Sequence, residues 1–106
     1  MRLDITFRNM KPSDRIRERV EKKFQKVAKH LREPIDADLV LKVEKHRHSA
    51  EIRVSGAGES FTAHEATEDL YATIDAIMTK LERTVRRAKE RSIDRSQAPA
   101  AQVADR

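Results

Sequence analysis

This 106-residue chain has four histidines, and their imidazole nitrogens could bind a metal ion. His46 and His48 lie two residues apart, so they share one face of a strand and could hold a metal ion together with His64 or His30. A zinc site needs three or four convergent ligands. We therefore favour a polar hairpin tip over a metal site, and we expect neither a metal nor a cofactor.

A second possibility is a carboxylate pair, because Asp36 and Asp38 also share one face of a strand. Catalysis by such a pair requires a cleft and two different environments, whereas these residues begin a strand and should be solvated. The chain has no cysteine, which excludes thiolate zinc sites and cysteine nucleophiles. Its two glycines cannot build a phosphate-binding loop. We expect that the protein is not an enzyme.

Lysine and arginine offer a different chemistry, the binding of phosphates. The chain has 23 Lys and Arg against 18 Asp and Glu, which gives a net charge of +5. A basic surface gains free energy when it displaces counterions from a polyanion. The composition alone is weak evidence, so the placement of the bases decides how it is interpreted.

Charge is sorted around both expected helices when residues are placed about 100° apart. On the first helix one flank is basic (Arg15, Arg19, Lys22 and Lys26, bordered by Lys23) and the other is polar or acidic (Asp14, Glu18, Glu21 and Gln25). On the second, the basic flank is Lys80, Arg83, Arg87 and Arg91, and the acidic flank is Glu68, Asp75, Glu82 and Glu90, with Arg86 as an exception.

In both helices, viewed along the axis from the N-terminus, the bases lie on the same side of the apolar stripe. If they run parallel, one basic stripe enters the groove between them and the other lines an outer edge, which together make a positive band. The alternative is a pair of solvated helices with local i,i+4 ion pairs such as Glu18 with Lys22. Two helices with the same sorting favour a binding surface.

Aromatic residues are too few to form a stacking platform for bases. Phe7, Phe24 and Phe61 occupy expected core positions, which leaves Tyr71 at the border of the core. The band should therefore contact phosphates and recognise shape rather than base sequence.

The elements that position these residues follow from the apolar periodicity. Strands are expected at 2–8, about 36–45, about 49–55, and around Phe61 and Ala63, with a turn at 56–58. One helix should begin at Ser13 and end before Pro34, and a second should begin at 67–69. The expected core stripes are Ile16, Val20, Phe24, Val27 and Leu31, and Leu70, Ile74, Ile77, Leu81, Val85 and Ala88.

The order β-α-β-β-β-α predicts an α+β fold. We expect one four-stranded sheet with a parallel crossover followed by an antiparallel meander, both helices packed on one face, and the other face in water. Residues 1–92 should form this domain, and 93–106, which lack periodicity, a disordered tail. No segment has the length of a membrane span, and the N-terminus lacks the apolar run of a signal peptide, so we expect a cytoplasmic protein that contacts no membrane.

Three stretches of the chain carry a family resemblance: Leu39-Val-Leu-Lys-Val-Glu-Lys45, Asp69-Leu-Tyr-Ala-Thr-Ile-Asp75 and Lys80-Leu-Glu-Arg-Thr-Val-Arg-Arg-Ala-Lys89. They resemble the signature stretches of the ribosome hibernation promoting factor and ribosome-associated inhibitor A family. The opening Met1-Arg-Leu-Asp-Ile-Thr6 is similar too, and the resemblance covers about residues 1–92. The chain is too short for the second domain of the long family members, so it resembles a short form.

The resemblance implies the same fold and a function. Such a protein binds 16S rRNA of the small subunit, and the 70S ribosome, in the channel of messenger RNA and the A- and P-site transfer RNAs. It thereby blocks translation and preserves idle ribosomes in stress and stationary phase. From the fold, we expect this chain to be a monomer when free. The alternatives are a generic double-stranded-RNA-binding module and a modulator of a transcription factor, sigma-54, acting through protein contacts. Basic residues on both helices contact RNA in the family, and the matching positions here are Lys23, Lys26, Lys80, Arg83, Arg87, Lys89 and Arg91. Our full set of candidate RNA-binding residues is Lys22, Lys23, Lys26, Lys29, Lys80, Arg83, Arg86, Arg87, Lys89 and Arg91.

Overall fold

The computed structural model describes the backbone of residues 1–97 and the side chains of residues 1–90. Its elements, in chain order, are β1 (Arg2–Arg8), α1 (Asp14–Ala28), β2 (Ile35–Glu44), β3 (Arg47–Gly56), β4 (Glu59–Thr67) and α2 (Leu70–Gln97). The expected order of elements and the α+β class are confirmed. Among the described residues, no helix combines the length and the apolar character needed to cross a bilayer.

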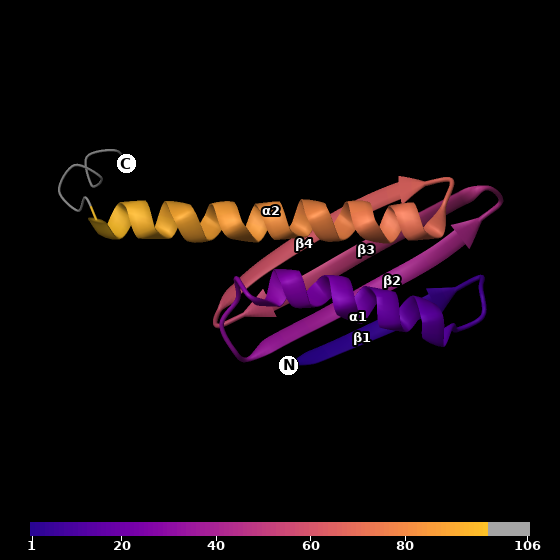
Figure 1. The fold of residues 1–106 in the computed structure, drawn as a ribbon, viewed down its shortest axis with the longest axis horizontal. Coiled ribbons are helices and arrows are strands. Elements are labelled where there is room, and N and C mark those ends of the chain that lie inside the picture. The colour runs from indigo at the N-terminus through magenta and orange to yellow at the C-terminus, as the bar shows by residue number, and fades with distance from the viewer. Residues whose placement is uncertain (98–106) are drawn as a thin grey trace.

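The four strands form one sheet in the order β1-β2-β3-β4, with β1 parallel to β2 and the remaining pairs antiparallel. Both helices lie on the same face of this sheet and run in the same direction, as Figure 1 shows. The parallel crossover, the antiparallel meander and the parallel helices are therefore as predicted.

The strand alternation builds the core because register aligns the apolar residues of each strand. One row across the sheet joins Ile5 to Leu39, Leu39 to Ile52 and Ile52 to Ala63. The members on the two central strands are at most 1% exposed, whereas Ile5 on the edge strand is half-buried. A shift by one residue would expose the whole row, so the pairing of the strands is strongly specified.

Two tight turns connect the antiparallel strands. The β3–β4 turn is Ala57 and Gly58, both with positive φ (48° and 92°), the conformation that suits a two-residue hairpin. Gly56, the last residue of β3, is buried, and a Cβ there would lie 3.0 Å from the Arg32 carbonyl oxygen. In the β2–β3 turn, His46 occupies the tip as expected, but Arg47 and His48 already belong to β3.

The first helix begins as predicted and ends earlier than its apolar stripe. The Ser13 hydroxyl accepts a hydrogen bond of 3.3 Å from the Ile16 amide, which is the expected N-cap. The chain leaves the helix after Ala28 because the amides of His30 and Leu31 bond three residues back, at 3.0 Å, and tighten the last turn. Leu31 still packs against the core, from the loop.

The second helix is longer than the sheet that supports it. Asp69 caps it by accepting a hydrogen bond of 2.9 Å from the Ala72 amide. Its predicted stripe is buried from Leu70 to Val85, but Ala88 is only half-buried because α2 continues past the end of the sheet (Figure 1). The helix extends to Gln97, so the expected domain boundary at 92 falls inside it; the rest of the expected tail, 98–106, lies outside the described residues.

Thr73 is a buried polar residue that the sequence pattern did not single out. Its hydroxyl lies 3.1 Å from the His48 carbonyl oxygen on β3, 2.9 Å from the Asp69 carbonyl oxygen and 2.7 Å from the Thr67 hydroxyl. The residue thereby joins the start of α2 to the β2–β3 hairpin. Removing the hydroxyl would take away the hydrogen bond to the His48 carbonyl oxygen, the one that links the helix to β3, and such a loss at a buried site costs free energy.

We predict that Thr73→Val lowers the free energy of unfolding by about 1–3 kcal/mol, because valine keeps the shape and removes the hydrogen bonds. Thr84→Val is the matched control on the same helix, since the Thr84 hydroxyl is exposed and bonds only the Lys80 carbonyl oxygen of its own helix. It should change stability by less than about 0.5 kcal/mol. Urea denaturation followed by circular dichroism measures both, and equal losses would contradict the tertiary role of Thr73.

Candidate nucleic-acid interface

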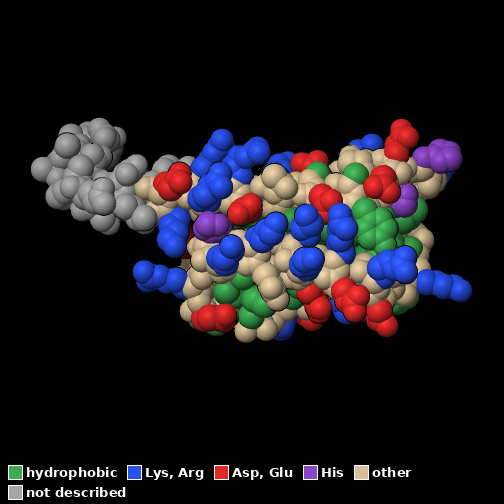
Figure 2. Space-filling model, viewed as in Figure 1, with side chains coloured by type: hydrophobic (Ala, Val, Ile, Leu, Met, Phe, Trp, Pro, Cys, Tyr) green, Lys and Arg blue, Asp and Glu red, His purple; other side chains and the backbone are tan. Residues whose placement is uncertain are grey.

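All ten candidate residues lie on the helical layer or at its edge. Lys22, Lys23 and Lys26 are on α1, Lys29 is its C-cap, and Lys80, Arg83, Arg86, Arg87, Lys89 and Arg91 are on α2. Eight of them are exposed, Lys23 is half-buried, and Arg91 lies in α2 beyond the residues whose side chains are described. Figure 2 shows blue side chains gathered along both helices on this face.

Most of these bases are not neutralised by the protein itself. Among residues 1–90, only two of the ten, Lys23 and Lys80, lie within ion-pair distance of a carboxylate. The i,i+4 pair between Glu18 and Lys22, which was the example given for the alternative interpretation, does not occur in this part of the chain. Seven bases with described side chains thus remain available to an external anion: Lys22, Lys26, Lys29, Arg83, Arg86, Arg87 and Lys89.

The groove between the helices is where the basic flank of α1 meets the acidic flank of α2. Arg19 donates two hydrogen bonds to the Asp75 carboxylate, from Nε at 3.3 Å and from Nη2 at 2.8 Å. Lys23 lies 3.8 Å from the same carboxylate, and His30 lies 3.6 Å from Glu82. The expected entry of one basic stripe into the groove is confirmed, and part of that stripe is neutralised there.

Arg19 is also held by an aromatic ring. Its guanidinium carbon lies 5.4 Å from the centre of the Tyr71 ring, within the range of a cation–π contact. The hydrogen bonds to Asp75 raise the pKa of Arg19 above its ordinary value, so this residue stays charged. The pair itself is part-exposed and contributes little to stability; its main effect is to fix the position of Arg19.

Arg19 and Asp75 lie on the flanks that the sequence predicts, but their pairing was not predicted. The charge pattern does contain this pairing, because two parallel helices sorted in the same sense bring the basic flank of one against the acidic flank of the other. Tyr71 was placed at the border of the core, where the structure finds it half-buried.

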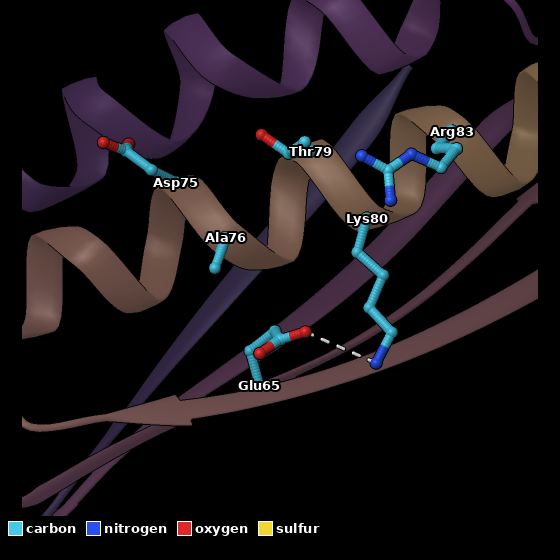
Figure 3. Close-up of a pocket in the computed structure, with 6 residues that line it drawn as sticks. All are labelled: Glu65, Asp75, Ala76, Thr79, Lys80 and Arg83. Carbon is cyan, nitrogen blue, oxygen red and sulfur yellow. Dashed lines mark ion pairs between the residues drawn. The ribbon is translucent and has the colours of Figure 1, made fainter.

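The basic flank of α2 lies on the outer side of the helix, over β4. Lys80 reaches the Glu65 carboxylate at 3.4 Å and the His64 carbonyl oxygen at 3.2 Å, both on β4. Figure 3 shows Lys80 extending to β4, while Asp75 points the other way, towards α1. The labelled side chains line an open hollow of about 520 Å³. This hollow lacks the apolar enclosure that is typical of small-molecule sites.

The structure does not bring the histidines together as metal ligands, and it does not place the Asp36 and Asp38 pair in a cleft. His48 lies on β3 and pairs in register with Thr67, whereas His64 is paired with Glu51, on the opposite face of the sheet, and His46 is in the turn. Within the described residues there is no group of three metal-ligating side chains. Asp36 and Asp38 are exposed, as expected, and both accept hydrogen bonds from Arg2.

The fold and these charges define a class, a small α+β domain with one basic and largely unpaired helical face. A family model described as "Sigma 54 modulation protein / S30EA ribosomal protein" matches residues 3–93. The protein belongs to this family, as the resemblance implied.

Individual relatives agree with the family model. The chain is 29% identical to a ribosome hibernation promoting factor of Azotobacter vinelandii over 97 residues, which is 92% of this chain and 91% of the relative. It is 32% identical to that of Escherichia coli over 91 residues, 86% of this chain and 96% of the relative. The crystal structure of the Thermus thermophilus Protein Y N-terminal domain superposes with a TM-score of 0.73 at 35% identity, covering 81% of this chain and 93% of that one.

The interhelical ion pairs predict how one carboxylate affects the helical face. Asp75→Asn should release Arg19 and Lys23 from their shared anion and increase affinity for a polyanion such as heparin. Glu21→Gln is the matched control, because Glu21 is an exposed acid on the far flank of α1 and its loss changes net charge equally. Asp75→Asn should therefore elute from heparin at a higher salt concentration than Glu21→Gln. Identical elution would mean that net charge alone controls binding.

Proposed function

We propose that this protein is a ribosome hibernation factor. Its basic helical face binds 16S rRNA in the small-subunit channel of messenger RNA and the A- and P-site transfer RNAs. Occupation of that channel inhibits translation and preserves idle ribosomes. Membership of the family supports the ribosome as the partner, and the relatives named ribosome hibernation promoting factor support the outcome.

The observation that carries the proposal is the row of unpaired bases on both helices. Arg83, Arg86 and Arg87 are exposed on one helix, and Lys22 and Lys26 are exposed on its neighbour. Side chains of this length held on two packed helices present several cations at once to a rigid polyanion. Each phosphate they neutralise releases counterions, which makes the association favourable and dependent on salt.

The chemistry of the face favours the RNA backbone over base sequence. The three phenylalanines contribute to the core or pack against it, and Tyr71 is half-buried beneath Arg19. Folded rRNA offers closely spaced phosphates in a fixed arrangement, so a fixed set of cations can be selective by shape. The protein then acts as a monomeric, stoichiometric inhibitor in the cytoplasm, where its partner is found, and not as a catalyst.

The main alternative is a generic double-stranded-RNA-binding module, because two helices on one face of a small sheet also suit an A-form duplex. A modulator of sigma-54, the other function named in the family description, would act through protein contacts. Sedimentation through sucrose gradients separates these possibilities. A hibernation factor comigrates with 30S and 70S particles in the presence of excess duplex RNA, whereas a generic module is displaced from them.

The test of the interface is charge reversal of Arg83 and Arg87 together. The double variant Arg83→Glu, Arg87→Glu should lose more than about hundredfold in affinity for small subunits, or ~2.7 kcal/mol, and should no longer inhibit translation in vitro. Both residues are exposed, so the fold should survive. Glutamine at both positions should weaken binding less, and the log–log dependence on salt should become shallower by about 0.9 per lost phosphate contact.

Two controls separate the location of charge from its amount. Arg53→Glu makes the same charge change as Arg83→Glu alone, but Arg53 is on the sheet face opposite the helices, and its loss should have little effect. Glu18→Gln with Glu21→Gln adds two charges at exposed positions on the acidic flank of α1, away from the groove and from the basic flank of α2, and should also do little. Binding like that of the wild type by a folded Arg83→Glu, Arg87→Glu protein would reject the proposed interface.

A further inference from the structure

The sheet face opposite the helices holds a second group of bases, near the β2–β3 hairpin. Arg8, Lys42 and Arg47 come from three adjacent strands, and with Ser49, Glu51 and His64 they help to line a concavity of about 350 Å³. None of these residues belongs to the helical surface. In Figure 1 the ends of β1, β2 and β4, marked by arrowheads, lie at this end of the sheet.

Strand register brings these side chains together. Arg8 is the partner of Lys42, and Lys42 is the partner of Ser49, so one row across three strands carries two bases and a hydroxyl. Arg47 lies beside this row, opposite Glu44. Arg8 and Arg47 are on β1 and β3, with β2 between them, so their strands are about 9.6 Å apart. Two arginine side chains are long enough to span this separation and reach one small anion together.

Two of the three bases have no counter-ion in the described part of the chain. Lys42 lies 3.5 Å from Glu44, but neither Arg8 nor Arg47 is within ion-pair distance of any carboxylate among residues 1–90. Arginine donates a planar fork of hydrogen bonds that fits an oxyanion such as phosphate. The pocket therefore offers two arginine forks that the protein does not use.

The rest of the same face is unsuited to a polyanion. At the other end of the sheet Arg2 is surrounded by Asp4, Asp36 and Asp38, with which it forms ion pairs. Glu44 and Glu51 also border the pocket itself. A long stretch of phosphates would be repelled by these carboxylates, whereas a single phosphate seated between Arg8 and Arg47 would not have to cross them.

We propose that this pocket binds one backbone phosphate of a second rRNA segment, so that the protein contacts RNA on both faces. The proposal rests on the proposed function, since the ribosomal small subunit supplies the phosphate. The free bases of α2 lie in its C-terminal half, and the C-terminal end of this helix points away from the β2–β3 hairpin, where the pocket residues are (Figure 1). Two RNA segments, rather than one continuous strand, are therefore needed to occupy both surfaces.

The test compares arginines that differ only in position along one strand. Arg47→Glu and Arg53→Glu change the same strand, the same face and the same charge, and both residues are exposed, but only Arg47 lines the pocket. Binding to isolated small subunits is measured over a range of salt concentrations. Arg8→Glu with Arg47→Glu should lose about tenfold or more in affinity, and Arg47→Glu alone should lose several-fold, because phosphate contacts dominate the affinity. Arg53→Glu should stay within about twofold of the wild type.

A crosslink identifies what occupies the pocket. The chain has no cysteine, so Ala66→Cys, next to Ser49 in register, gives a single attachment point for a photoreactive group, and Ser60→Cys gives the matched control at the acidic end of the same face. The position-66 adduct should contain rRNA and the position-60 adduct should not. Equal binding by the Arg8→Glu, Arg47→Glu and Arg53→Glu proteins overturns the inference, as does a position-66 adduct with protein only.

Binding measurements on the two double variants and on the wild type distinguish a failure of this inference from a failure of the proposed function. If Arg83→Glu, Arg87→Glu abolishes binding while Arg8→Glu, Arg47→Glu does not, the helical face is retained and the pocket is rejected. A wild-type chain that does not bind small subunits removes both.

Discussion

The sheet requires cover on one face only, because the buried apolar side chains of all four strands lie on the same side. Two helices suffice to exclude water from that face, and the stripe from Ile16 to Val27 and the one from Leu70 to Val85 are buried against it. Each helix is then fixed in rotation. The side chains opposite the stripes must then face outward. Burial of apolar surface therefore sets the direction in which the charged side chains of the helical layer point.

Periodicity predicted most of this fold because the apolar residues of strands and helices repeat at periods that few other structures satisfy. The ends of elements were predicted less well. Leu31 continues the helical stripe in sequence but packs from a loop, and Ala88 continues the second stripe but lies where the sheet no longer supports it. The exposure of Ala88 is set by the length of the sheet, which the sequence of the helix does not encode.

The sequence predicted the direction in which the charged side chains of each helix point, but not the contacts that they make. A helical wheel gives the angle of Arg19 and Asp75 about their own axes, but only the packing of α1 against α2 decides that these two angles coincide. The pocket around Arg8 and Arg47 was missed for a similar reason. Its residues are 39 positions apart in the chain, and strand register alone brings them near each other.

The length of α2 beyond the sheet has a thermodynamic consequence. Among the described side chains, which end at residue 90, Val85 is the last one of this helix in the core, and the turns that carry Arg86, Arg87 and Lys89 bury little against the sheet. A helical segment held mainly by its own backbone hydrogen bonds is close to balance with the coil in water, and neighbouring like charges shift that balance towards the coil. An anionic surface reverses the shift, so helix formation in this segment and occupancy of the surface are linked equilibria. The overhang therefore couples local folding to binding, and amide exchange in these turns would follow the bound fraction.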